Sequence, residues 1–303
     1  MTIEYFASVM SSTLREITPL LLVTLCACFC SKVKVFNIAL EGTLLISAFI
    51  AYITQYFVHN IFISVLAAMA VAMLITFIMA FFIVHLKGQP MIVGMAINTF
   101  ALGFTTFLLQ AVFNTKGVAP KDGMTGLDKI SIPLISDIPF IGTALADLTV
   151  IDYLAFVLAI VCFVILYKTV IGFRLRAIGI NSEAASSLGI NVERYQIIST
   201  TLSGAMIGLA GCLLTLASPY VLQQSISGAR GYIALAANAL AMSHPLGALL
   251  SSTLFGFTKA LCRVLQNTAI KQQLLECIPY LATVIAMAVY NAIAIRQSKR
   301  RHA

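Results

Sequence analysis

Charge and tryptophan are both scarce in this 303-residue chain. Only 10% of its residues are charged and none is tryptophan, whereas about 25% of the residues in an ordinary soluble domain are charged. Apolar residues make up 60% of the chain, and the mean hydropathy is +0.98. This composition excludes a conventional soluble domain and is typical of a membrane protein that crosses the bilayer several times. Without tryptophan, tyrosine and phenylalanine must form any belt at the membrane interfaces.

Signatures of enzymes and metal sites are missing as well. The sequence has no Gly-x4-Gly-Lys-Ser/Thr phosphate loop, no His-Glu-x-x-His and no Gly-x-Ser-x-Gly. We therefore expect a protein that is not an enzyme and does not itself hydrolyse ATP. The seven cysteines lie in or beside apolar runs, where free cysteine behaves as a small hydrophobe, so we predict no metal site. The net charge of +8 comes from Lys and Arg between those runs, which predicts no nucleic-acid partner.

The apolar runs predict an all-α polytopic membrane protein with about eight to ten transmembrane helices in one domain, residues 1–303. A helix needs about 20 residues to cross the hydrocarbon layer, and several runs are that long. The run at 232–242 is too short and is followed by His244-Pro245, so we expect a half-helix or a broken helix within 232–262. Residues before 17 are short and mixed and predict at most an interfacial turn. The runs lie at 17–31, 38–57, 61–86, 91–113, 150–167, 197–217, 232–242, 246–262 and 275–295.

Basic residues between the runs predict the orientation, because Lys and Arg are retained on the cytoplasmic side. The hydrophilic stretch 168–196 is rich in Arg and is placed inside as a cytoplasmic loop. Lys32, Lys34 and Lys87 then also fall inside, together with a cytoplasmic C-terminus. The Gly-, Pro- and Asp-rich segment 114–149 falls outside as an extracytoplasmic loop. Lys259, Arg263 and Lys271 are left on the outer side, against the rule.

Three polar residues within apolar runs are candidates for a substrate pathway: Glu41, Asn98 and Asn238. A charged side chain within a membrane helix is costly and usually faces protein or water, although Glu41 could also pair with nearby lysines or support a helix start. The two asparagines lie in similar contexts and could face a cavity and bind a hydroxylated ligand. They could equally hydrogen-bond a neighbouring helix.

Glycine patterns predict close packing and a turn. Gly204, Gly208 and Gly211 form a small-residue stripe that lets helices approach closely. The stretch that begins at Gly228 and leads into Tyr232 favours a tight turn before a re-entrant or broken helix, with an ordinary loop as the alternative.

Several stretches together resemble a known family. They are NIALEGTLLISAFIAYI, RLRAIGINSEAASSLGINVERYQ, SGAMIGLAG and ARGYIALAANALAMSHPLGALLSSTLFGF. In this order they look like the membrane permease subunit of ABC importers for branched-chain amino acids, ribose, other simple sugars and nucleosides. The resemblance spans roughly residues 36–257 and is closest to the nucleoside and simple-sugar branch.

The resemblance implies a set of partners. These are a second permease subunit, the same or different, a cytoplasmic ABC ATPase that uses ATP and Mg²⁺, and an extracytoplasmic substrate-binding lipoprotein. The stretch around Glu183 resembles the element that docks on the ATPase, and its arginines could add charge complementarity. The alternative is a plain solvated loop whose charges only fix topology. The predicted coupling residues are Arg174, Arg176, Glu183, Ala184, Ala185, Gly189 and Arg194.

The resemblance thus implies a permease subunit in the bacterial plasma membrane, surrounded by lipid and without a cofactor of its own. An ion-coupled secondary transporter of a small polar solute is the alternative. That alternative would need more intramembrane carboxylates than Glu41.

Overall fold

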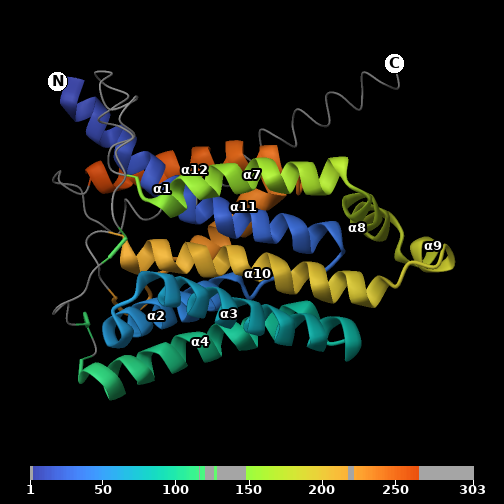
Figure 1. Ribbon diagram of the computed structural model, residues 1–303, viewed down its shortest axis with the longest axis horizontal. Coiled ribbons are helices and arrows are strands. Elements are labelled where there is room, and N and C mark those ends of the chain that lie inside the picture. Colours follow the sequence, from blue (N-terminus) through green and yellow to red (C-terminus); the bar gives the residue numbers. More distant parts are fainter. Residues whose placement is uncertain (1–2, 116, 120–125, 128–147, 218–221, 266–303) are drawn as a thin grey trace.

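The computed structural model describes residues 3–115, 117–119, 126–127, 148–217 and 222–265. Most of the predicted outer segment 114–149, the apolar run 275–295 and the C-terminal tail lie outside the described residues. Within them every regular element is helical (Figure 1). The helices are α1 (Ile3–Lys32), α2 (Leu40–Val58), α3 (Ile61–Ala80), η1 (Phe81–His85), α4 (Pro90–Phe113), α7 (Val150–Lys168), α8 (Val170–Ile180), α9 (Ser182–Ser187), α10 (Val192–Leu216), α11 (Arg230–Leu240) and α12 (Pro245–Leu265).

This architecture confirms the predicted all-α polytopic fold. Six helical segments of the described residues are long and apolar enough to cross a membrane: α1 from Met10 onward, α2, α3 with η1, α4, α7 and α10. Figure 1 shows these long helices running side by side. Helix α11 has 11 residues and spans about 16 Å at 1.5 Å per residue. It is the half-helix that the short run at 232–242 predicted.

Helix α1 lies at the centre of the bundle. Between Met10 and Lys32 the most apolar part of α1 is 89% buried. It is buried because α7, α8, α10, α11 and α12 all pack against α1. The expectation that residues before 17 form at most an interfacial turn is wrong, since α1 already begins at Ile3. Ser11, Thr13 and Glu16 are buried in the protein. The helix therefore continues through these polar residues into the bundle. Burial by neighbouring helices, which the sequence pattern does not reveal, extends α1.

Helix α10 packs closely on α2 and α3 through its small residues. A Cβ at Gly208 would lie 2.5 Å from Met69 Cα of α3, and a Cβ at Gly211 would lie 2.7 Å from Ala48 N of α2. Gly204 likewise lies against Thr76 of α3. Such distances are too short for a side chain, so the absence of one at these positions lets the backbones approach.

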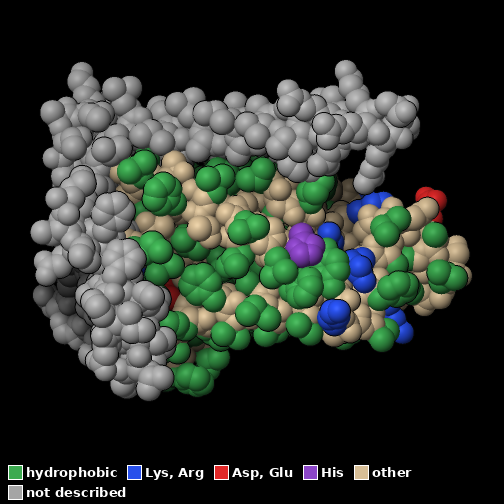
Figure 2. All heavy atoms as spheres, turned by 90° about the horizontal axis from the view of Figure 1, so that it is seen from above, with side chains coloured by type: hydrophobic (Ala, Val, Ile, Leu, Met, Phe, Trp, Pro, Cys, Tyr) green, Lys and Arg blue, Asp and Glu red, His purple; other side chains and the backbone are tan. Residues whose placement is uncertain are grey.

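The basic loops gather at one end of the bundle, here called the α8–α9 end. Lys34 Nζ donates to the Ile180 carbonyl at 3.1 Å, and Lys87 Nζ lies 3.4 Å from Glu193 Oε1. Lys32 lies there too, with its carbonyl beside Gly179. Figure 2 shows Lys and Arg side chains near this end, while hydrophobic side chains cover much of the described part of the same face. The prediction that these loops share one side of the protein is therefore confirmed for the described residues.

Candidate functional site

The backbone turns sharply inside the bundle just before α11. Ala229 adopts a left-handed conformation with φ 58°, and α11 begins at the next residue. The first N–H groups of a helix have no partner within the helix, and in a membrane each unsatisfied group is costly. Here the carboxylate of Glu41, from the first turn of α2, supplies the partners.

Both oxygens of Glu41 accept hydrogen bonds from the segment that leads into α11. Glu41 Oε1 accepts from Ser227 Oγ at 2.6 Å and from the Ala229 N–H at 3.0 Å. Glu41 Oε2 accepts from the Gly231 N–H at 2.7 Å. A Cβ at Gly231 would lie 2.4 Å from Glu41 N, so glycine is needed for this approach. A negative charge at this position also interacts favourably with the positive end of the helix dipole.

Asn98 places this site well inside the span. Its Oδ1 accepts from the Gly42 N–H at 2.7 Å, and its Nδ2 donates to the Ile38 carbonyl at 3.0 Å. The same Nδ2 donates to Tyr232 Oη at 3.1 Å. Asn98 lies eight residues after Pro90, which is about 12 Å along α4. The starts of α2 and α11 therefore meet at α4, within the depth of the bundle.

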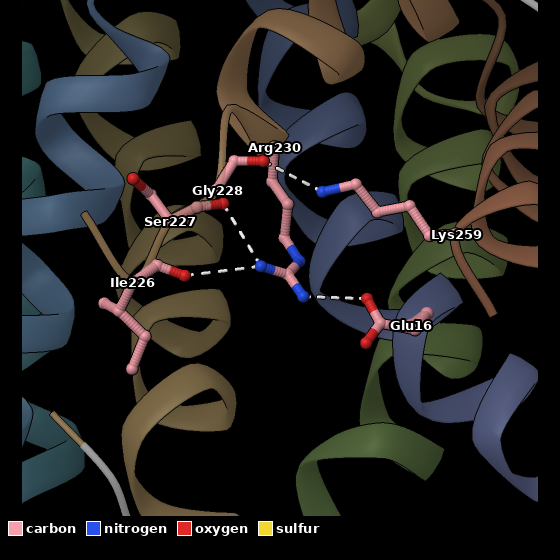
Figure 3. Close-up of polar contacts among 6 residues, drawn as sticks. All are labelled: Glu16, Ile226, Ser227, Gly228, Arg230 and Lys259. Atoms are coloured by element: carbon pink, nitrogen blue, oxygen red, sulfur yellow. Dashed lines mark hydrogen bonds and ion pairs between the residues drawn. The ribbon is translucent and has the colours of Figure 1, made fainter. Parts of the chain in front are cut away.

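A charged pair lies on the other side of the break (Figure 3). Arg230 Nη2 and Glu16 Oε2 are 2.7 Å apart, and their side chains are 13% and 6% exposed. Arg230 Nη1 also donates to the carbonyls of Ile226 and Ser227 at 3.3 and 3.2 Å. Lys259 Nζ from α12 donates to the Gly228 carbonyl at 2.9 Å. Two carboxylates and two cations thus hold the turn between α1, α2 and α12.

The structure brings only two of the three predicted pathway residues together. Glu41 and Asn98 both contact the first turn of α11, at Gly231 and Tyr232. Glu16 contacts the same turn through Arg230. Asn238 lies about two turns further along α11, where its Nδ2 donates to Ser31 Oγ of α1 at 2.9 Å. It is 6% exposed and joins α11 to α1.

Sequence reasoning missed Glu16 and Tyr232 at this site. Tyr232 keeps 45% of its surface exposed while its hydroxyl contacts Asn98, so it presents a polar edge outside the packed core. Glu16 was assigned to a short terminal segment. The sequence did hold a signal for this site: Glu16, Glu41 and Arg230 are charged residues that each lie within or beside an apolar run.

The predicted coupling stretch projects from the α8–α9 end (Figure 1). Asn181 Oδ1 caps α9 by accepting from the N–H groups of Glu183 and Ala184, and Gly189 follows α9 with φ 81°. Glu183 and Ala184 are exposed, whereas Ala185 is buried at 3%. Leu188 is 81% exposed. The end of α9 therefore offers a carboxylate and an apolar side chain on a locally capped scaffold.

The three predicted arginines do not share one face. Arg174 donates to Tyr195 Oη and lies 5.8 Å from the centre of that ring, and it borders a groove that Arg194 also lines. Arg176 instead lies over the Tyr167 ring at 4.8 Å. Arg174 and Arg194 therefore line one groove, and Arg176 does not.

Comparison with known proteins decides the family. Residues 9–292 match the family described as branched-chain amino acid transport system / permease component. The chain belongs to this permease family. The permease is 31% identical to the guanosine ABC transporter permease protein NupQ of Bacillus subtilis, over 94% of this chain and 92% of the relative. It is 32% identical to the nucleoside ABC transporter permease protein NupC of Lactococcus lactis, with 92% and 90% covered.

A more distant relative is named for a different substrate. The putative glucose ABC transporter permease protein TsgC13 of Haloferax volcanii is 25% identical over 97% of the permease and 95% of the relative. No solved structure matches the permease. Family membership and the apolar helices make it an integral membrane protein.

Proposed function

We propose that the permease forms the membrane pathway of an ATP-driven importer for nucleosides. The similarity to the guanosine and nucleoside permeases, each covered over nine-tenths of its length, carries this proposal. ATP hydrolysis, with its Mg²⁺, belongs to a separate ATPase subunit. A simple sugar remains a second substrate class, because the putative glucose permease is also related.

The polar site at the start of α11 supports the pathway. The Tyr232 hydroxyl accepts from Asn98 Nδ2 within the span, and its O–H can donate to a ribose or a base. Glu41 holds the backbone there, since both its oxygens accept hydrogen bonds. Glu16 is paired with Arg230. Carboxylates used in this way give no support to ion-coupled transport.

The α8–α9 end is proposed to be cytoplasmic, where α9 docks on the ATPase of a bacterial plasma membrane. The C-terminus is proposed to lie on the same side, as its basic residues predict. The exposed Glu183 and Leu188 would meet the ATPase, and the left-handed Gly189 would let the chain turn back into α10. A second permease subunit and an extracytoplasmic binding lipoprotein would complete the importer.

Uptake by the reconstituted importer tests this proposal. Radiolabelled guanosine, a pyrimidine nucleoside and glucose should be supplied to vesicles that contain both permeases, the ATPase and the binding protein. Nucleoside uptake that needs internal ATP is the expected result. Uptake that persists without the ATPase and collapses with the membrane potential would overturn the proposal.

Variants of α9 test the docking role. Glu183→Lys and Gly189→Val should leave the permease inserted but abolish the stimulation of ATP hydrolysis by loaded binding protein. Ser186→Ala, an exposed change on the same helix, is the matched control and should keep the stimulation. Full stimulation in Glu183→Lys would remove α9 from the coupling surface.

A further inference from the structure

A groove extends from the α8–α9 end along helix α10. It encloses about 790 Å³, within the range of about 300–1,000 Å³ that is usual for ligand sites. One wall is a stripe of α10 that includes Tyr195, Ile198, Leu202 and Met206. The opposite wall belongs to α7 and α8. Phe29 of α1 lines the groove between the two walls.

The apolar stripe of α10 along the groove has about the height of one leaflet of a bilayer. From Tyr195 to Met206 the stripe covers 11 residue steps of α10, or about 16 Å at 1.5 Å per residue. The hydrocarbon core of a bilayer is about 30 Å thick, so each leaflet contributes about half of that. Ile198 and Leu202 are 63% and 67% exposed, so the upper groove is open to the side and accessible from lipid.

The lower end of the groove lies where the apolar helices end. Gln196 Nε2 donates to the Val33 carbonyl at 2.8 Å, which places this turn of α10 level with the end of α1. Glu193, one turn earlier, pairs with Lys87. Tyr195 therefore lies at the interface between hydrocarbon and water, a level that tyrosine favours.

Two arginine side chains lie near Tyr195 at the membrane interface. Arg174 and Arg194 both line the groove and are exposed, and none of the lining residues is acidic. Arg174 Nη1 donates to Tyr195 Oη, and the Arg174 guanidinium lies over the Tyr195 ring. Within the described part of the chain, neither arginine forms an ion pair with a carboxylate. Basic pockets between transmembrane helices bind the headgroups of anionic lipids.

We infer that this groove is a binding site for an anionic phospholipid of the surrounding bilayer. Its phosphate lies between Arg174 and Arg194, and one acyl chain lies along Ile198, Leu202 and Met206. Arginine suits phosphate because its planar guanidinium can donate two parallel hydrogen bonds. The site is separate from the polar site at α11, and the inference holds whatever solute the permease transports.

The absence of tryptophan makes a direct test possible. The variant L202W puts a single indole in the groove. The variant L74W is a matched control: Leu74 is 55% exposed on α3, between Ala72 and Thr76, which contact Gly204 of α10. The two indoles therefore lie at similar depth. Each variant is reconstituted, without the ATPase, in phosphatidylcholine vesicles with a small fraction of phosphatidylglycerol carrying brominated chains, which quench indole fluorescence.

In L202W we expect quenching that corresponds to an about thirtyfold preference for brominated phosphatidylglycerol over brominated phosphatidylcholine, because two arginines at the membrane surface both attract the anionic headgroup. L74W should show quenching in proportion to the bulk fraction of either lipid. Adding R174Q and R194Q to L202W should remove the preference. Equal quenching in L202W and L74W, or a preference that survives both arginine changes, would overturn the inference.

Lipid that copurifies with the otherwise unchanged permease provides a second measurement. Mass spectrometry after mild-detergent extraction should find anionic phospholipid enriched over its share in the membrane, and less of it in R174Q/R194Q. Enrichment that is identical in both proteins would contradict the assignment even if L202W failed to fold.

Discussion

Two short helices of the permease, α9 and α11, solve the same problem in different ways. Each begins with N–H groups that have no partner within the helix. At α9 the preceding residue, Asn181, caps them with its own side chain. At α11 the cap comes from Glu41, far away in the sequence on α2. A helix in water can use a neutral local cap, whereas a helix that starts inside the bundle recruits a charge from another helix.

The difference has a consequence for stability. If Asn181 is lost, water can replace it, because α9 projects from the bundle and most of its residues are exposed. If Glu41 is lost, the N–H groups of Ala229 and Gly231 lose their partner in a partly buried site, and the contacts between α1, α2, α11 and α12 weaken together. The following changes should therefore affect the α11 break strongly and α9 weakly.

Arg230→Met should have the largest effect. It removes the guanidinium that pairs with the buried carboxylate of Glu16, and breaking a buried ion pair in this way costs about 3–5 kcal/mol. The unfolding midpoint in detergent should fall accordingly. The double variant Glu16→Met/Arg230→Met should recover much of the loss, because it removes both charges. A single variant as stable as the unchanged permease would show that this pair does not hold the break.

Glu41→Gln should come next. The amide keeps one carbonyl oxygen but places an NH₂ donor against the N–H groups of Ala229 or Gly231, and it loses the charge. Loss of charged hydrogen bonds of this kind costs about 2–3 kcal/mol. Ser227→Ala is the graded control, because it removes one donor at 2.6 Å from Glu41 and leaves the backbone cap, at a cost of about 1 kcal/mol. Equal loss in the two variants would argue against backbone capping as the main role of Glu41.

Gly208→Ala tests how rigidly the bundle holds α2 and α3 beside α10. The new methyl group would meet Met69 Cα at 2.5 Å, and overpacking of this kind costs about 1–3 kcal/mol. Gly103→Ala on α4 is the control, since its Cβ would meet nothing within 4 Å. That change should be neutral or should stabilise the helix by up to about 1 kcal/mol. Similar midpoints for both variants would mean that α10 can shift away from α3.

The contrast between α9 and α11 also explains what the sequence could predict. The long spans, the half-helix at 232–242 and the shared end of the basic loops all depend on local hydropathy, length or charge, and they were predicted. The start of α1 at Ile3 depends on burial by other helices and was not. Glu16 was overlooked for the same reason, because its partner Arg230 is more than two hundred residues away.

The candidate site shows the same limit. Glu41 and Asn98 were selected as polar residues within apolar runs, and the structure places both at the start of α11. Asn238 has a similar sequence context to Asn98 but contacts α1 instead. Similar local sequences cannot show which neighbour a helix face meets, because that depends on how the whole bundle packs.

Asn181→Ala should have the smallest effect on global stability. It removes the side chain that accepts from the N–H groups of Glu183 and Ala184, and loss of a helix cap costs about 1 kcal/mol. Because α9 has six residues and lies outside the bundle, the cost should stay local. The unfolding midpoint should barely change, whereas amide hydrogen exchange within α9 should rise by about fivefold, the ratio that corresponds to about 1 kcal/mol. Asn181→Asp keeps an acceptor and should restore slow exchange. A fall in midpoint as large as that of Glu41→Gln would show that α9 is coupled to the bundle as tightly as α11, and the contrast between the two helices would not hold.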